Sequence, residues 1–475
     1  MNYGQFLNMV PEASLVAILI ILFFADFALS KSEKKHPVLR CLTHTLLLLQ
    51  LVPCVLAEPT SVFGGLYVST AAANAMKLIL TGGTLIVAIM AQAWLKAASR
   101  YEGEFYILLV STLLGMYVMT SSGHFLMFFL GLEMASVPMA CLVAMDKWKK
   151  DSAEAGAKYI LTATFSSAIM LYGISFIYGA CGTLYFDDVA AKLSITPMTI
   201  AGLVFFFAGL GFKLSLVPFH FWTADTYQGA PTTVTAYLSV VSKGAAAFAL
   251  CAILMKVFAP MIAQWEILLY VVIVLSITIA NLFAMRQSEL KRFMAFSSIS
   301  QAGYIMLAVI GNSTMGVASL MFYTLVYVAA NLAVFAVINV VEQNNGGNTD
   351  RSALTGFYET NPRLSLLMTL ALFSLAGIPP FAGMFSKFFV FMAAAQQGSA
   401  WAYVVVFIAL VNTVPSLYYY LLIVKEMYIK KTASPLPTFQ SDTATKLALA
   451  LCTVGIVLFG VWSGIYEWLT SVSAM

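Results

Sequence analysis

Long apolar runs separated by short polar breaks occupy almost the whole chain. A helix needs roughly 20 apolar residues to cross a hydrocarbon core of about 30 Å. Cutting the chain at turn residues and charge clusters gives about fourteen such runs, with the boundary at Ser121–Gly123 the least sharply marked. Their approximate limits are 14–30, 39–57, 75–95, 104–121, 124–144, 158–180, 199–221, 232–257, 266–285, 294–311, 316–341, 364–396, 402–425 and 446–470. The pattern predicts an all-α polytopic membrane protein with about 14 transmembrane helices.

Basic residues gather in the loops that follow odd-numbered spans. These residues are Lys31, Lys34, Lys35, Arg40, Lys96, Arg100, Lys147, Lys149, Lys150, Arg286, Lys291, Arg292, Arg351, Arg363, Lys430, Lys431 and Lys446. The loops after even-numbered spans hold little more than Lys192, with Lys256 near a helix end. By the positive-inside rule the basic loops are cytoplasmic. We therefore expect a multi-pass protein of a bacterial inner (cytoplasmic) membrane with both termini periplasmic.

Composition supports a chain that faces lipid. Hydrophobic residues make up 61% of it and charged residues only 10%, where a soluble protein carries about 25% charge. The net charge of +4 is spread over short loops, so no nucleic-acid partner is expected. The six cysteines have no metal-ligand spacing, and no nucleotide-binding or haem motif is visible. We expect no cofactor and no metal in this chain.

Two spans contain helix-breaking residues. The seventh holds Pro218, and the twelfth holds Gly377, Pro379 and Pro380. Proline removes a backbone donor and clashes one turn back, so each span should break or kink there; an ordinary kink is the alternative for either one alone. The two lie five spans apart and so have opposite orientations, which is the pattern of inverted-repeat transporters.

We therefore predict two inverted five-helix repeats with broken seventh and twelfth helices. The expected units are 1–103 (three N-terminal helices), 104–257 (first repeat), 258–425 (second repeat) and 426–475 (a loop and the last helix).

Four charged residues lie deep inside apolar runs: Glu133, Lys213, Lys243 and Lys387. A charge near the bilayer centre costs roughly 3 kcal/mol on insertion scales, and such residues usually line an ion or proton path. We predict a polar line across the membrane plane, with Glu133 as the partner of Lys213. The alternatives are lysines that snorkel to the interface and a neutral, hydrogen-bonded glutamic acid.

Three further residues are weaker candidates. His220 follows the break in the seventh span and could connect the line to water, because its pKa lies near neutrality. Lys158 lies four residues after Glu154, which fits a surface pair as well as a proton-uptake group. Lys77 lies near a span end, and we expect it at the membrane interface.

Several segments resemble a known family. FLGLEMASVPMACLVAM, GFKLSLVPFHFWTADTYQGAPTTVTAYLSVVSKGAAAFAL, ELKRFMAFSSISQAGYIML and LAGIPPFAGMFSKFFVF are similar to the antiporter-like subunits of respiratory complex I, over nearly all fourteen helices. YQGAPTTVTAYLSVVSK resembles the N-type branch in particular. The chain also lacks the long lateral helix of the L-type branch.

The resemblance implies a role for each deep charge. Glu133 would tune Lys213, Lys243 would be the central relay, and Lys387 would lead to the exit side. It implies proton translocation in the membrane arm of an NADH–quinone oxidoreductase, driven by quinone reduction on other subunits that hold the flavin, iron–sulfur clusters and quinone.

The expected partners are the neighbouring M-type subunit, the small A-, J- and K-type subunits and the lipid bilayer. The alternatives are a subunit of an Mrp-type sodium/proton antiporter, of a membrane-bound hydrogenase, or a purely structural membrane-arm subunit.

Overall fold

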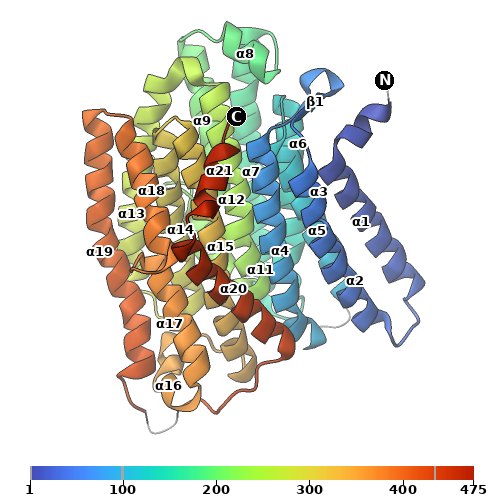
Figure 1. Cartoon of the computed structure of the whole chain (residues 1–475), viewed down its shortest axis with the longest axis vertical. Helices are drawn as coiled ribbons and strands as arrows, with labels where there is room; N and C mark the ends of the chain where they lie inside the picture. Colours follow the sequence, from blue (N-terminus) through green and yellow to red (C-terminus); the bar gives the residue numbers. More distant parts are fainter. Residues whose placement is uncertain (1–2, 98–100, 433–434, 475) are drawn as a thin grey trace.

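The chain folds into a bundle of membrane-length helices, seen in a computed structural model that describes residues 3–97, 101–432 and 435–474 (Figure 1). Thirteen helices of the described chain are long and apolar enough to cross a membrane. The fourteenth predicted span is the interrupted twelfth one, so the predicted fold class and approximate count are confirmed. The protein is a multi-pass membrane protein.

The α-helices lie close to the predicted spans. They are α1 (Val10–Ala28), α2 (Lys35–Leu49), α3 (Leu51–Leu56), α4 (Ala71–Ala97), α5 (Glu102–Thr120), α6 (Phe125–Val143), α7 (Lys150–Cys181), α8 (Phe186–Lys192), α9 (Pro197–Leu214), α10 (Phe221–Gly229), α11 (Thr232–Tyr237), α12 (Lys243–Lys256), α13 (Ile262–Ala284), α14 (Leu290–Ile310), α15 (Thr314–Asn344), α16 (Phe357–Thr360), α17 (Pro362–Ala376), α18 (Ala382–Gln396), α19 (Ala400–Tyr428), α20 (Thr443–Val461) and α21 (Gly464–Ser471). Short 3-10 turns are η1 (Tyr3–Asn8), η2 (Phe63–Gly65), η5 (Ala259–Met261) and η6 (Arg351–Leu354). The uncertain boundary at Ser121–Gly123 is a true break between α5 and α6.

A small hairpin closes one end of the bundle. Strands β1 (Thr60–Val62) and β2 (Tyr67–Ser69) pair antiparallel, with Val62 opposite Tyr67. The hairpin is anchored to the α5–α6 turn, because Val68 N donates to Ser121 O and Gly123 N donates to Leu66 O, each at 2.9 Å. It therefore covers the start of α4.

The seventh and twelfth spans are both broken, as predicted. α9 ends at Leu214 and is followed by Ser215, which has a left-handed φ of 60°; α10 starts at Phe221. α17 ends at Ala376 and is followed by Gly377, which has a φ of 89°; α18 starts at Ala382. Each break leaves the carbonyls of a helix end without helical partners at membrane depth, where only protein or water can satisfy them.

Two local features differ from the prediction. α7 begins at Lys150, eight residues before the predicted start, so Lys158 lies two turns inside a helix. The eighth span is one continuous helix, but its segment η4 (Leu238–Ser242) is a π turn immediately before Lys243. Single π turns inside α-helices are frequent at functional sites.

The most buried helices form the centre of the bundle. α14 and α15 are buried along nearly their whole length, whereas α1, α2 and α19 expose most of theirs. Figure 1 shows α1 at one edge of the bundle and α19 at the opposite edge. Lys213, Lys243 and Lys387 are buried within this bundle, whereas Glu133 is half-buried.

Candidate functional site

The three lysines in apolar runs are buried in the bundle. Lys213, Lys243 and Lys387 are 4%, 2% and 5% exposed. Each ammonium lies near a tyrosine ring, at 5.7 Å from Tyr159, 5.5 Å from Tyr227 and 5.0 Å from Tyr304 respectively. At this burial none of them snorkels to the interface.

Lys213 occupies the last turn of α9, next to the break. Its Nζ donates to Ser136 Oγ at 2.8 Å and to Tyr159 OH at 3.0 Å. These partners come from α6 and α7, which pack beside α9. A lysine with only hydroxyl partners can lose its proton without leaving an unpaired carboxylate behind.

Glu133 does not reach Lys213 in this structure. Glu133 is half-buried on α6, and its carboxylate accepts a hydrogen bond from Ser167 on α7. Among the described residues no ion pair within 4.0 Å joins it to a lysine. Ser136, three residues further along the same helix, contacts Lys213 instead, so any effect of Glu133 on Lys213 passes through space or through that turn.

Lys243 follows the π turn of the eighth span. Its Nζ donates to Ser298 Oγ at 2.7 Å, and the Tyr227 hydroxyl lies 3.4 Å from the same oxygen. Asn331 on α15 donates to Ser239 Oγ at 2.7 Å, one turn before Lys243. Side chains from α10, α14 and α15 thus meet at this lysine.

Lys387 lies on α18, just past the second break. Its Nζ donates to the carbonyl of Ala376 at 2.8 Å. Ala376 is the last residue of α17, so the broken helix offers a free carbonyl at its negative end. The break itself thereby creates the partner of this lysine.

A small polar cavity adjoins Lys387 on the side of α14 and α15. Its volume is about 10 Å³, and its lining includes Gln301, Tyr323, Tyr327 and Ser374. Tyr323 OH donates to Gln301. A polar cavity of this size is at the lower limit for one water. These residues extend the polar line between Lys243 and Lys387; sequence patterning did not single them out, although Gln301 and the serines of FSSISQAGY are unusual for a fully buried helix.

His220 is at the edge of burial, whereas Lys158 is partly exposed. His220 is 9% exposed inside the first break, and no described group bonds its Nδ1. Lys158 is partly exposed and pairs with Glu154 at 2.7 Å and with Asp225 at 2.6 Å. Asp225, on α10, also pairs with Arg292 at 2.6 Å. The structure therefore adds Asp225 and Arg292 to the expected Lys158–Glu154 pair, around a pocket of about 220 Å³.

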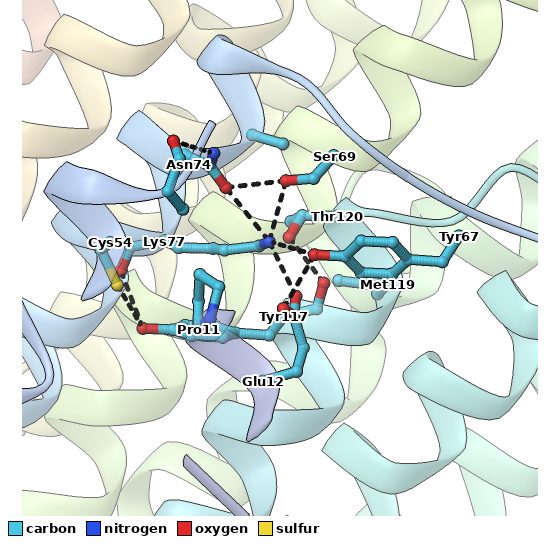
Figure 2. Close-up of polar contacts among 12 residues, drawn as sticks. Pro11, Glu12, Cys54, Tyr67, Ser69, Asn74, Lys77, Tyr117, Met119 and Thr120 are labelled. Carbon is cyan, nitrogen blue, oxygen red and sulfur yellow. Dashed lines mark hydrogen bonds and ion pairs between the residues drawn. The ribbon is translucent and has the colours of Figure 1, made fainter. Parts of the chain in front are cut away.

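Lys77 lies near a span end, but the sequence did not predict that its side chain is buried inside the protein. Figure 2 shows Lys77 enclosed by polar groups: Nζ lies 2.7 Å from Glu12 Oε1 and donates to Tyr67 OH and Ser69 Oγ, each at 3.2 Å. Lys77 has no exposed surface. The hairpin and α1 cover it, and Glu12 lies 65 residues away in sequence, so no local pattern could reveal the pair. In contrast to Lys213, Lys243 and Lys387, Lys77 has a carboxylate partner.

No metal site is evident in the described residues, where no group of three or more His, Cys, Asp or Glu side chains converges. Buried lysines beside two broken helices of opposite orientation define the class of polytopic transport-type membrane proteins built on inverted repeats.

Comparison with known proteins identifies the family. The family described as NADH:quinone oxidoreductase/Mrp antiporter, TM matches residues 122–413. The chain belongs to this family. It is 58% identical over 477 aligned residues to a protein of Phocaeicola vulgatus named NADH-quinone oxidoreductase subunit N, covering all of both chains.

Solved structures agree on the fold. A chain of respiratory complex I from Thermus thermophilus with bound aureothin matches with a TM-score of 0.80 and 30% identity, over 96% of this chain and 97% of that one. A chain of the Mrp complex from Dietzia matches with a TM-score of 0.85 at 19% identity, over 100% and 97%. The second likeness shows the fold alone.

Proposed function

We propose that the chain is the N-type, proton-translocating subunit in the membrane arm of an NADH–quinone oxidoreductase. The observation that carries the proposal is the row of three buried lysines without carboxylate partners, in a chain similar over its full length to a protein named as that subunit. Redox chemistry belongs to other subunits, and this chain needs only proton-carrying groups.

Within this proposal Lys213, Lys243 and Lys387 carry protons, and Glu133 modulates the first. In a medium of low dielectric a unit charge acts strongly on its neighbours. Protonation of one lysine therefore changes the free energy of protonating the next, even without direct contact. Tyr227, Ser298, Gln301 and Tyr323 fill the gaps between lysines with groups that both donate and accept.

Proton uptake is assigned to the basic-loop side, which we propose is cytoplasmic, with both termini periplasmic in a bacterial inner membrane. Lys158, Asp225 and Arg292 surround an open pocket there, and His220 is the N-cap residue of α10, the helix that carries Asp225. We propose neighbouring antiporter-like and small A-, J- and K-type subunits as partners, and residues 104–257 and 258–425 as the two repeats.

The test uses the assembled complex. Lys213→Ala, Lys243→Ala and Lys387→Ala should each lower proton pumping and coupled quinone reductase activity while subunit composition stays unchanged. Lys31→Ala, an exposed lysine on the same chain, is the matched control. Normal pumping in an assembled triple variant would instead favour a structural role.

The alternative is that the chain is a subunit of a sodium/proton antiporter. The similarity of its fold to a chain of the Mrp complex favours this alternative. Proteoliposomes distinguish the two. Proton uptake that persists without sodium supports the proposal, whereas an absolute sodium requirement supports the alternative.

A further inference from the structure

A groove lies between α17 and α20 at the end of the bundle where both helices begin. Its volume is about 820 Å³, within the ~300–1,000 Å³ typical of ligand sites. Leu364, Leu367, Leu449, Ala450 and Val454 form its apolar part, and Thr438, Gln440 and Ser441 line its polar rim. Because α20 is a membrane span that starts at Thr443, this rim lies at a membrane–water boundary. Both helices begin in the lower part of Figure 1.

Two cations without counter-ions flank the rim. Arg363 and Lys446 both line the groove and are exposed. Among the described residues neither has a carboxylate within 4.0 Å, although the nearby bases Lys430, Arg351 and Lys96 are all paired. No acidic residue lines the groove. Asp442, at the start of α20, lines a different groove and faces Lys96.

Arg363 also lies where helix electrostatics disfavours a cation. Arg363 is in the first turn of α17, which has no acidic residue, and Lys446 is in the first turn of α20, where Asp442 caps the helix by accepting a hydrogen bond from Thr445 N. The N-terminal end of a helix carries partial positive charge and prefers an anion. At α17 the N-cap residue Asn361 makes no capping bond, because its side chain binds Pro437 O and Phe439 N instead. The uncapped start of α17 and the two cations Arg363 and Lys446 thus lie around the same groove.

We propose that this groove binds an anionic glycerophospholipid, with the phosphate between Arg363 and Lys446 and an acyl chain along Leu367, Leu449 and Val454. Phosphate fits the donors, since guanidinium, ammonium and free helix N–H groups are its usual partners. The apolar floor requires a hydrocarbon tail, which a free phosphate lacks. Basic pockets between membrane helices are typical sites for anionic lipid headgroups.

A second groove of the same chain has no charged residue and serves as a comparison for the α17–α20 groove. The groove between α13 and α19 has a volume of about 520 Å³ and is lined by Tyr270, Trp401 and aliphatic side chains, with no charged residue. Such a surface accommodates any acyl chain. Selectivity for an anionic headgroup is therefore expected only at the α17–α20 groove.

Photolabelling of the assembled complex tests the proposal. A photoactivatable phosphatidylglycerol should label peptides within 361–367 and 438–454, and unlabelled phosphatidylglycerol should compete whereas phosphatidylethanolamine should not. The double variant R363Q/K446Q should lower the apparent affinity about 25-fold, the equivalent of about 2 kcal/mol for two basic residues. The control R286Q/K31Q removes two other exposed bases and should leave labelling unchanged.

Three outcomes overturn the proposal. Labelling that survives R363Q/K446Q shows that the two bases do not hold the lipid. Competition by inorganic phosphate as strong as that by the lipid shows a simple anion site. Absence of labelling together with crosslinks from these peptides to another subunit shows that protein covers the groove.

Discussion

Lys213 donates its hydrogen bond to Ser136, at 2.8 Å, rather than to Glu133 one turn earlier on the same helix. A hydroxyl partner holds the ammonium without a fixed countercharge. A bond to a charged group contributes about 1.5–3 kcal/mol, so Ser136→Ala should slow a rate-limiting proton transfer through Lys213 by roughly tenfold or more.

The measurement is proton pumping by the reconstituted complex. Ser175→Ala, which removes a serine hydroxyl bonded only to its own helix, is the control. If Ser136→Ala pumps normally while Glu133→Gln does not, Lys213 depends directly on the carboxylate, and the contact seen here is secondary.

The cavity beside Lys387 makes a second prediction. Tyr323→Phe removes the hydroxyl that bonds Gln301 and leaves the packing unchanged. The connection between Lys243 and Lys387 should weaken, and pumping should fall several-fold at unchanged assembly. Tyr270→Phe, on the lipid-facing side of α13, is the matched control and should have no effect. Equal proton pumping by the two variants would show that Tyr323 is not part of the proton path between Lys243 and Lys387.

The Glu12–Lys77 pair is expected to be structural. Glu12→Gln would leave a buried ammonium unpaired, at a cost of about 3–5 kcal/mol, whereas Glu12→Gln with Lys77→Met should recover most of that loss. Thermal unfolding of the complex reports the difference. Asp187→Asn, which breaks the exposed pair with Lys256, should change stability by no more than about 1 kcal/mol. A double variant that is stable yet fails to pump would show that Lys77 carries protons.

Gly377 is predicted to tolerate no side chain. Its φ of 89° is unfavourable for other residues, and an added Cβ would lie 3.0 Å from Lys387 Cδ. Gly377→Ala should displace Lys387 and lower pumping, with a conformational cost of about 1–2 kcal/mol. Gly346→Ala also has a positive φ but nothing within 4 Å, so it isolates the backbone cost. Similar activity in both variants would mean that the contact with Lys387 does not matter.

Acid should weaken the network around Asp225. Burial raises the pKa of this carboxyl, but its bonds to Lys158 and Arg292 outweigh burial and lower the pKa below the ordinary value of 3.8. A carboxyl with a depressed folded-state pKa contributes stability above its unfolded pKa and loses it as pH falls through the folded pKa. The wild type should therefore exceed Asp225→Asn in unfolding temperature by a constant margin from pH 5 to 7, and the margin should shrink below about pH 4. A margin that grows in acid would contradict this network.

The sequence predicted the architecture because hydropathy and proline act locally. Span lengths, the break before Pro218 and the break at Gly377 all follow from neighbouring residues. Contacts set by helix rotation could not be predicted: Ser136 and Glu133 differ by three positions on one helix, and only packing decides which faces Lys213. The burial of Lys77 could not be predicted because its cover comes from α1 and the hairpin. The π turn at Leu238–Ser242 has no local signature in the sequence.

The two breaks also carry different chemistry at matching positions. Asp225 lies ten residues past Ser215 (225 − 215 = 10), and Lys387 lies ten past Gly377 (387 − 377 = 10). The residue ten positions past the break is thus a partly exposed acid in the seventh span and a buried base in the twelfth.

The π turn before Lys243 also sets the direction in which the side chain of this lysine points. It holds one residue more than an α turn, and each residue of an α-helix advances by about 100° around the axis. If Leu238–Ser242 wound as an ordinary α-helix, everything after it would rotate by that angle relative to α11, and the Lys243 ammonium would turn away from Ser298. The contact between Lys243 and Ser298 therefore depends on the extra residue held by the π turn immediately before this lysine.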